Sequence, residues 1–265
     1  MQHENILNST NKSAYARADV VDYFQNFDDL FPAEKVLFFE LAEKIKGSKL
    51  LDIGIGGGRT TGHLLGVCDE YTGVDYVPQF ARETAKKYPE ARILAADARN
   101  LKEFGDEAFD FVLFSFNGID CISDSDRLQA LGEIFRVLKP CGTFMFSSHN
   151  RDYKNFNRLP WRRKIEFSAA FAKFFLYSLY HLPKHFGMKK YEVHTDDYAV
   201  VNDSDHRYSL LFYYIGIDKQ IEQLERTGFF ETKAYDKYGQ ETEHDTESHW
   251  IYYVATKGQM SHAVN

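Results

Sequence analysis

The sequence predicts an α/β fold with a doubly wound, mostly parallel sheet of about seven strands and an insertion after the fifth strand. Two observations support this fold class. Short apolar runs alternate with helical patterns through residues 48–150, and such alternation is typical of a parallel sheet covered by helices on both faces. The alternation stops after residue 150 and resumes near residue 216. The segment between these two points is therefore the predicted insertion.

The composition is that of an ordinary globular protein. The chain has 265 residues, of which 44% are hydrophobic and 27% are charged. Its three cysteines have no zinc-ligand spacing, so we expect neither a disulfide framework nor a metal site. The first residues are polar and unlike a signal peptide, and no apolar run approaches the roughly 18 residues of a membrane span. We therefore expect a cytoplasmic protein.

Five strands are predicted before residue 150 from short apolar runs that end at glycine or polar residues. The clearest helix is predicted over 126–138, where apolar residues recur at spacings of three and four before Pro140. Because proline cannot continue a helix, we expect Pro140 to lie in the turn after it. The five predicted strands are 49–53, 71–75, 91–96, 109–114 and 142–147.

The second half of the chain is less regular. Residues 158–182 predict a helix with aromatic residues on most of its surface. Residues 190–215 predict two extended segments, because alternate residues near the end are apolar or aromatic. The last predicted elements are a helix over 218–227 that ends at Gly228 and strands over 229–238 and 248–256.

These elements predict five regions along the chain. The core of the sheet is interrupted by one insertion, which is rich in aromatic and basic residues. The regions are an N-terminal helical cover at 1–47, a core at 48–150, the insertion at 151–215, the end of the core sheet at 216–257 and a tail at 258–265.

The strongest motif is a glycine-rich turn that directly follows the first predicted strand and runs from Asp52 to Arg59 as DIGIGGGR. Glycine permits positive φ and lets backbone N–H groups approach a ligand closely. A tight strand–helix turn without a ligand is the alternative. In the glycine pattern of a dinucleotide-binding turn, Arg59 would occupy the last position, where close packing of the helix on the strand requires a small residue. The motif therefore disfavours a nicotinamide or flavin cofactor.

An acid followed by glycines at alternate positions, as in Asp52, Gly54, Gly56 and Gly58, resembles the first motif of class I S-adenosylmethionine-dependent methyltransferases. The resemblance is strong over about residues 34–150 and weaker over 206–256. It implies a Rossmann-like sheet with an antiparallel last strand. It also implies S-adenosylmethionine as methyl donor, S-adenosylhomocysteine as product, and in-line transfer to an oxygen or nitrogen atom of a small-molecule acceptor.

The resemblance implies a donor site at the carboxyl ends of consecutive strands. Asp52 would bind the donor's amino group, Asp75 its ribose hydroxyls, and Asp97 with the Ala98 amide its adenine. Each acid also has a purely structural interpretation as a strand-end or N-cap residue. Tyr15 and Arg17 belong to an N-terminal stretch that we expect to fold over the donor. The complete predicted donor set is Tyr15, Arg17, Asp52, Gly54, Ile55, Gly56, Asp75, Tyr76, Val77, Asp97, Ala98, Ser115, Phe116 and Asn117.

The candidate general base is His149, which follows the fifth predicted strand where the donor methyl group would point. In methyl transfer the donor supplies the electrophile and the protein supplies alignment. A base is needed only when the acceptor atom carries a proton at working pH. A hydrogen-bonded structural histidine is the alternative. On sequence position alone we expect removal of His149 to lower kcat by less than about tenfold.

Positive charge is concentrated in one part of the chain. Residues 151–190 hold ten Lys or Arg and two acids, a net charge of +8 within a chain whose net charge is −7. Because arginine binds phosphate and carboxylate well, the cluster Arg162, Arg163 and Lys164 predicts a lid over an anionic acceptor. A solvated basic face and a contact with a membrane surface are the alternatives.

Two other functions remain open at this point. A methyltransferase acting on a macromolecule, whether RNA, protein or lipid, would use the basic insertion to recruit it. The rest of the chain is acidic, with a net charge of −15, and this disfavours an extended surface for binding nucleic acid. A non-catalytic S-adenosylmethionine-binding module is the other alternative.

Overall fold

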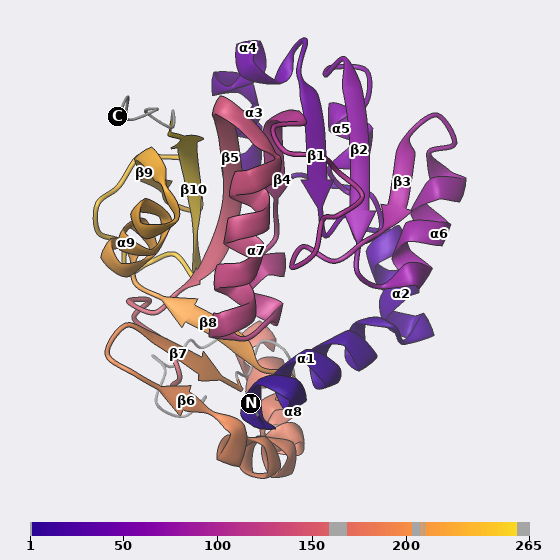
Figure 1. Cartoon of the computed structure of the whole chain (residues 1–265). Helices are drawn as coiled ribbons and strands as arrows, with labels where there is room; N and C mark the ends of the chain where they lie inside the picture. The colour runs from indigo at the N-terminus through magenta and orange to yellow at the C-terminus, as the bar shows by residue number, and fades with distance from the viewer. Residues whose placement is uncertain (1, 159–168, 203–207, 209, 259–265) are drawn as a thin grey trace.

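The computed structural model describes residues 2–158, 169–202, 208 and 210–258. The described residues form one ten-stranded sheet: three strands given below extend it from the end of β5, and the other seven lie in the order β3-β2-β1-β4-β5-β10-β9 (Figure 1). The first five of these in chain order run parallel, and β10 runs antiparallel to both β5 and β9. The predicted doubly wound sheet with an antiparallel last strand is therefore confirmed. The strands are β1 Lys49–Ile53, β2 Glu70–Asp75, β3 Arg92–Ala95, β4 Phe109–Phe114, β5 Leu138–Asn150, β9 Phe229–Tyr235 and β10 Trp250–Lys257.

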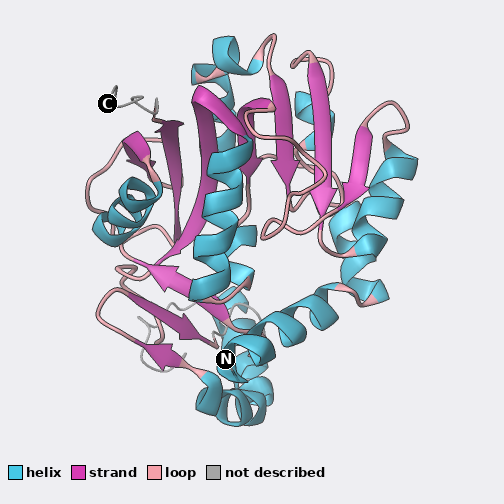
Figure 2. Ribbon diagram, in the orientation of Figure 1, coloured by secondary structure: helices cyan, strands magenta, loops and turns pink. Residues whose placement is uncertain are grey.

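Helices cover both faces of this sheet (Figure 2). One hydrophobic core lies under α7 and α9 and includes Leu131 and Leu224, and the other lies under α3, α4 and α5 and includes Leu37. No helix in the described ranges has the length and apolar character needed to cross a bilayer. The helices are α1 Gln2–Tyr15, α2 Ala18–Gln25, α3 Pro32–Glu40, α4 Ala42–Ile45, α5 Thr61–Leu64, α6 Pro78–Lys87, α7 Asp124–Val137, α8 Ala169–Met188 and α9 Ile217–Thr227, with 3-10 turns at Gly118–Cys121 and Lys189–Tyr191.

Strand β5 is longer than predicted and begins directly where α7 ends. Pro140 therefore lies inside β5 rather than in a turn after the helix. The pairing of β4 with β5 shifts register between Phe109 and Phe111, and Cys141 has a φ of 61°. A bulge of this kind accommodates a proline that cannot donate to the strand ladder.

Three strands, not the two predicted segments, lie between α8 and α9: β6 Val193–His194, β7 Tyr198–Val201 and β8 Phe212–Ile215. The last two residues of β5 pair with β8, beyond the end of β4. All four residues of β8 are buried, because Phe212 and Tyr214 pack in one apolar cluster and the other two residues in another. The extended conformation predicted from the alternation is confirmed for 212–215, and both faces of β8 are covered.

Candidate active site

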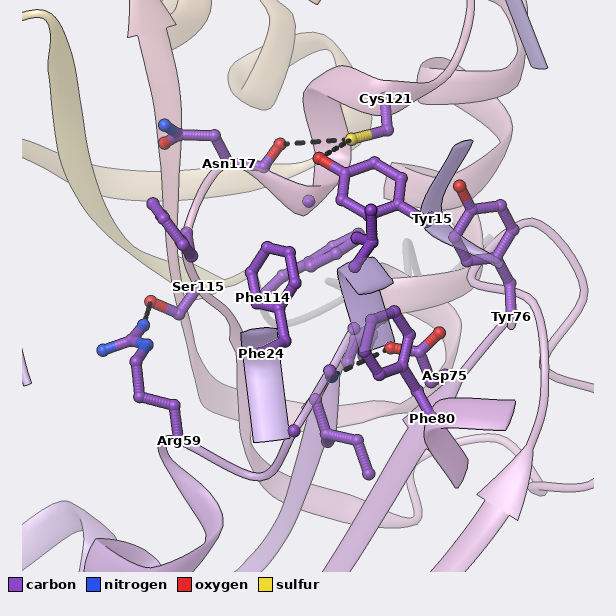
Figure 3. A pocket seen from close by; sticks show the side chains of 18 of the residues that line it. Tyr15, Phe24, Arg59, Asp75, Tyr76, Phe80, Phe114, Ser115, Asn117 and Cys121 are labelled. Carbon is purple, nitrogen blue, oxygen red and sulfur yellow. Dashed lines mark hydrogen bonds between the residues drawn. The ribbon is translucent and has the colours of Figure 1, made fainter. Parts of the chain in front are cut away.

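A cavity of about 630 Å³ lies at the carboxyl ends of β1, β2 and β4, and residues from the end of α1 and from α2 form one of its walls (Figure 3). This size falls within the roughly 300–1,000 Å³ of small-molecule and cofactor sites. Of the fifteen residues predicted from the sequence, including His149, all except Val77 line this one cavity. Residues predicted from six separate segments of the chain therefore come together in space.

The glycine-rich turn fits closely between the sheet and α2. Gly54 has a φ of 68°, and a Cβ atom there would lie 2.9 Å from the ring of Phe114. A Cβ atom on Gly57 would lie 2.0 Å from the carbonyl oxygen of Phe24 in α2. The N-terminal helices therefore rest directly on the turn, which only glycine permits at this position.

Asp75 joins the end of β2 to the glycine-rich turn (Figure 3). Its carboxylate accepts hydrogen bonds from the Gly56 N–H at 2.9 Å and from the Val77 N–H at 2.8 Å. Burial raises the pKa of Asp75 to about 6, against the effect of these two bonds. The Val77 side chain packs instead with Val21 and Phe80, and for this reason it does not line the cavity.

Asp52 lies below the turn and is buried. Its Oδ2 atom accepts hydrogen bonds from the Thr60 hydroxyl at 2.6 Å and the Tyr71 hydroxyl at 2.8 Å. Burial again raises the pKa of this carboxyl to about 6. The cavity therefore contains two buried carboxyl groups whose charge changes close to neutral pH.

Asp97 follows β3 and is already paired with a cation. Arg99 donates to both of its carboxylate oxygens, with Nη2 2.7 Å from Oδ2. Burial alone would raise the pKa of Asp97, but these hydrogen bonds hold it below its usual value. Beside Asp97, the buried hydroxyl of Tyr76 has no hydrogen-bond partner among the described residues.

His149 lines the opposite side of the cavity and is held by a buried carboxylate. Its Nδ1 atom lies 2.8 Å from Oδ2 of Asp120, which is fully buried in the 3-10 turn after β4. Arg127 of α7 donates to the other oxygen of Asp120 at 2.6 Å. With an ionised Asp120 carboxylate as acceptor, Nδ1–H is the donor of this hydrogen bond. On the other side of the ring, Asn117 Nδ2 lies 3.4 Å from Nε2.

A second buried polar cluster joins the N-terminal helices to the sheet. Glu34 of α3 is fully buried and accepts hydrogen bonds from Arg59, from the Ser115 hydroxyl and from the Phe31 N–H. The Arg59 guanidinium also lies 4.9 Å from the ring centroid of Phe31. Glu34, Arg59 and Asp120 could not be predicted as site residues from the sequence, because their partners are distant along the chain.

The rest of the lining is mostly apolar and aromatic. The two cations that line the described part of the cavity are already bonded to carboxylates, Arg17 to Asp19 and Arg59 to Glu34. The basic cluster 162–164 lies outside the described residues. Across the described ranges, no group of three or more His, Cys, Asp or Glu side chains is placed to hold a metal ion. The apolar and aromatic part of the wall includes Tyr15, Phe24, Phe114, Phe116, Ile122, Leu210 and Phe212.

Comparisons with known proteins agree with the arrangement of the core. Residues 51–146 match the family model of the methyltransferase domain. A probable S-adenosylmethionine-dependent methyltransferase of Mycolicibacterium smegmatis is 29% identical over 121 residues, 46% of each chain. A thiol S-methyltransferase of Rattus norvegicus is 28% identical over 144 residues, 51% of this chain and 57% of the rat protein. These matches span about half the length of the curated relatives.

Solved structures share the fold over most of the chain. A 1,6-didemethyltoxoflavin-N1-methyltransferase of Burkholderia thailandensis, solved with bound 1,6-didemethyltoxoflavin and S-adenosylhomocysteine, superposes with a TM-score of 0.61 at 17% identity, over 97% of this chain and 91% of that one. A possible histamine N-methyltransferase of Thermotoga maritima gives a TM-score of 0.53 at 17% identity, over 95% and 99%. At such identity the likeness concerns the fold.

Proposed function

We propose that this chain, which carries a methyltransferase domain of the class I S-adenosylmethionine-dependent family, transfers a methyl group from S-adenosylmethionine to a small and largely apolar acceptor. One observation carries the proposal. A single cavity joins the strand-end acids on one side to an aromatic wall and the His149–Asp120 pair on the other. Donor and acceptor therefore have separate, adjoining regions of one cavity.

The strand-end residues would hold the donor. Asp75 would accept hydrogen bonds from the ribose hydroxyls, Asp52 would bind the amino group, and Asp97 and the Ala98 amide would bind the adenine. S-adenosylmethionine, when bound, supplies the electrophilic methyl group. The glycine-rich turn, held by α2 on its outer side, aligns the donor for in-line transfer. Alignment is the main contribution of this part of the site.

His149 acts as general base for an acceptor that carries a proton on the attacking atom. Its Nε2 accepts that proton, while Asp120 keeps the ring in the required tautomer and stabilises the imidazolium that forms. The aromatic wall excludes water and favours an uncharged acceptor such as a phenol or a thiol. The described lining offers no unpaired cation, and so it gives no support to an anionic acceptor.

Two measurements test this function. Isothermal titration calorimetry should detect binding of S-adenosylhomocysteine but not of NAD, and tight binding of NAD would refute the proposal. Transfer of labelled methyl groups should then be measured with panels of phenols, thiols, amines and carboxylates. Activity confined to RNA, protein or lipid fractions would favour the macromolecular alternative. Donor binding without transfer to any acceptor would indicate a non-catalytic module.

Replacing Asp75 by alanine is expected to weaken binding of S-adenosylhomocysteine by about 1–3 kcal/mol, because hydrogen bonds to a buried carboxylate are lost. Calorimetry measures the change. Asp106→Ala, at a side chain that is 76% exposed, is the control and should leave the affinity unchanged. An Asp75→Ala variant that remains folded and binds like the wild type would show that Asp75 does not contact the donor.

Donor affinity is expected to fall as pH falls through about 6. The donor binds the ionised carboxylates, and the pKa values of Asp52 and Asp75 without donor are about 6. At pH 5 each of these groups is about nine-tenths protonated, which weakens binding about tenfold per carboxylate relative to pH 7.5. Calorimetry at both pH values measures the ratio. In Asp75→Asn the ratio of donor affinities at pH 7.5 and pH 5 should be about tenfold smaller than in the wild type. A variant with the wild-type ratio would show that Asp75 does not cause the pH dependence.

A further inference from the structure

Helix α8 presents an apolar face to solvent. The exposed fraction is 67% for Leu176, 80% for Tyr180 and 62% for Phe186, and Leu179 is 40% exposed. With Pro183, these residues recur at spacings of three and four, so they share one face of the helix. A surface helix of a globular protein normally shows polar residues to solvent, and a continuous exposed apolar face usually marks an interaction site.

The other side of α8 is the side that packs on the protein. His185 is buried, and its Nδ1 atom lies 3.1 Å from the Asn202 side-chain oxygen. Met188, at the end of the helix, packs on a cluster that contains Leu7 of α1 and Tyr213 of β8. Helix α8 therefore already packs on the protein through this side. The exposed apolar face is a second, separate face and is not part of the hydrophobic core.

Exposed lysines border the apolar face. Lys173 and Lys184 lie three or four residues from Leu176 and Tyr180, and Lys189 and Lys190 follow the end of the helix. Helix α8 contains no aspartate or glutamate. This charge pattern complements an anionic surface. A second copy of the chain would instead present the same lysine-bordered face, with no acid on α8 to oppose it.

We propose that α8 is an interfacial helix that lies along a membrane surface containing anionic phospholipids. Leu176, Leu179, Tyr180 and Phe186 enter the boundary between headgroups and acyl chains, and the lysines contact lipid phosphates. Buried apolar area and electrostatic attraction both contribute to binding of this kind. The inference depends only on the surface of α8 and is independent of the proposed methyl transfer.

Sedimentation of the full chain with lipid vesicles tests this inference. The protein should bind vesicles of phosphatidylcholine mixed with phosphatidylglycerol, bind phosphatidylcholine alone more weakly, and dissociate as salt increases. The double variant Leu176→Ser/Tyr180→Ser should lose at least about tenfold in affinity. Lys173→Gln and Lys184→Gln should each lose about fivefold. Phe39→Ser is the matched control, since Phe39 is 84% exposed on α3, and should bind like the wild type.

Three results would overturn the inference. The first is a wild-type protein that binds neither kind of vesicle, and the second is a folded Leu176→Ser/Tyr180→Ser variant that binds as the wild type does. The third is a dimer in solution that the same double variant converts to a monomer, which would assign the face to a second copy of the chain. Circular dichroism confirms folding of each variant, and the substituted side chains are exposed.

Discussion

Replacing His149 by alanine is expected to lower kcat by about 100-fold or more while donor affinity is retained. A positioned general base contributes about 10²–10⁴-fold when the acceptor must lose a proton. His149 lines the cavity, and its Nδ1 is held by the fully buried Asp120, so the ring has one defined orientation. Steady-state kinetics with the acceptor found in the transfer panel, together with calorimetry for the donor, measure the two quantities.

A histidine elsewhere on the surface provides the control for this prediction. His63 of α5 is exposed and does not line the cavity, so His63→Ala should leave kcat unchanged. A loss of less than tenfold in His149→Ala would reject the base and favour an acceptor that is already unprotonated, with catalysis by alignment. Sequence position alone predicted this smaller loss. The hydrogen bond to Asp120, 29 residues away along the chain, is the reason to expect the larger one.

Replacing Glu34 by alanine is expected to lower the free energy of unfolding by about 3–5 kcal/mol. The substitution leaves the Arg59 guanidinium buried without its carboxylate, and an uncompensated buried charge is strongly destabilising. It also removes the acceptor for the Ser115 hydroxyl and the Phe31 N–H. Equilibrium unfolding in urea measures the change.

Two further variants separate the ion pair from other effects. In Glu34→Leu/Arg59→Met both charges are absent, so much of the lost stability should return. Glu43→Ala, at an exposed position of the next helix, should change the free energy of unfolding by less than about 0.5 kcal/mol. If Glu34→Ala costs less than about 1 kcal/mol, Arg59 has another partner or reaches water, and the pair does not anchor the N-terminal helices.

Much of the core could be predicted, because the sequence patterns that indicate its strands and its glycine-rich turn each lie within a short segment. The strands at 49–53 and 109–114 have the predicted bounds, since each is a short apolar run that ends at a turn or polar residue. The acids Asp52, Asp75 and Asp97 could be assigned to one site because parallel strands place their carboxyl ends at one edge of a sheet. The glycine-rich turn could be recognised because its backbone requirements restrict it to glycine.

Other features depend on contacts between residues that are far apart in the sequence. From its position in the sequence Glu34 is an ordinary first-turn acid, but in the fold it accepts hydrogen bonds from Arg59 and Ser115. The sequence likewise gives no partner for His149, whose ring is hydrogen-bonded to Asp120 in the structure. Pro140 was predicted to follow the end of a helix, but it lies inside β5 beside a bulge that accommodates it. Sequence alone determined the alternation of strands and helices in the core and the strand ends at which the candidate site lies, because periodicity and glycine requirements are local. Tertiary packing alone decided which buried charges pair and which face of α8 meets solvent, because burial depends on what the rest of the chain places beside each residue.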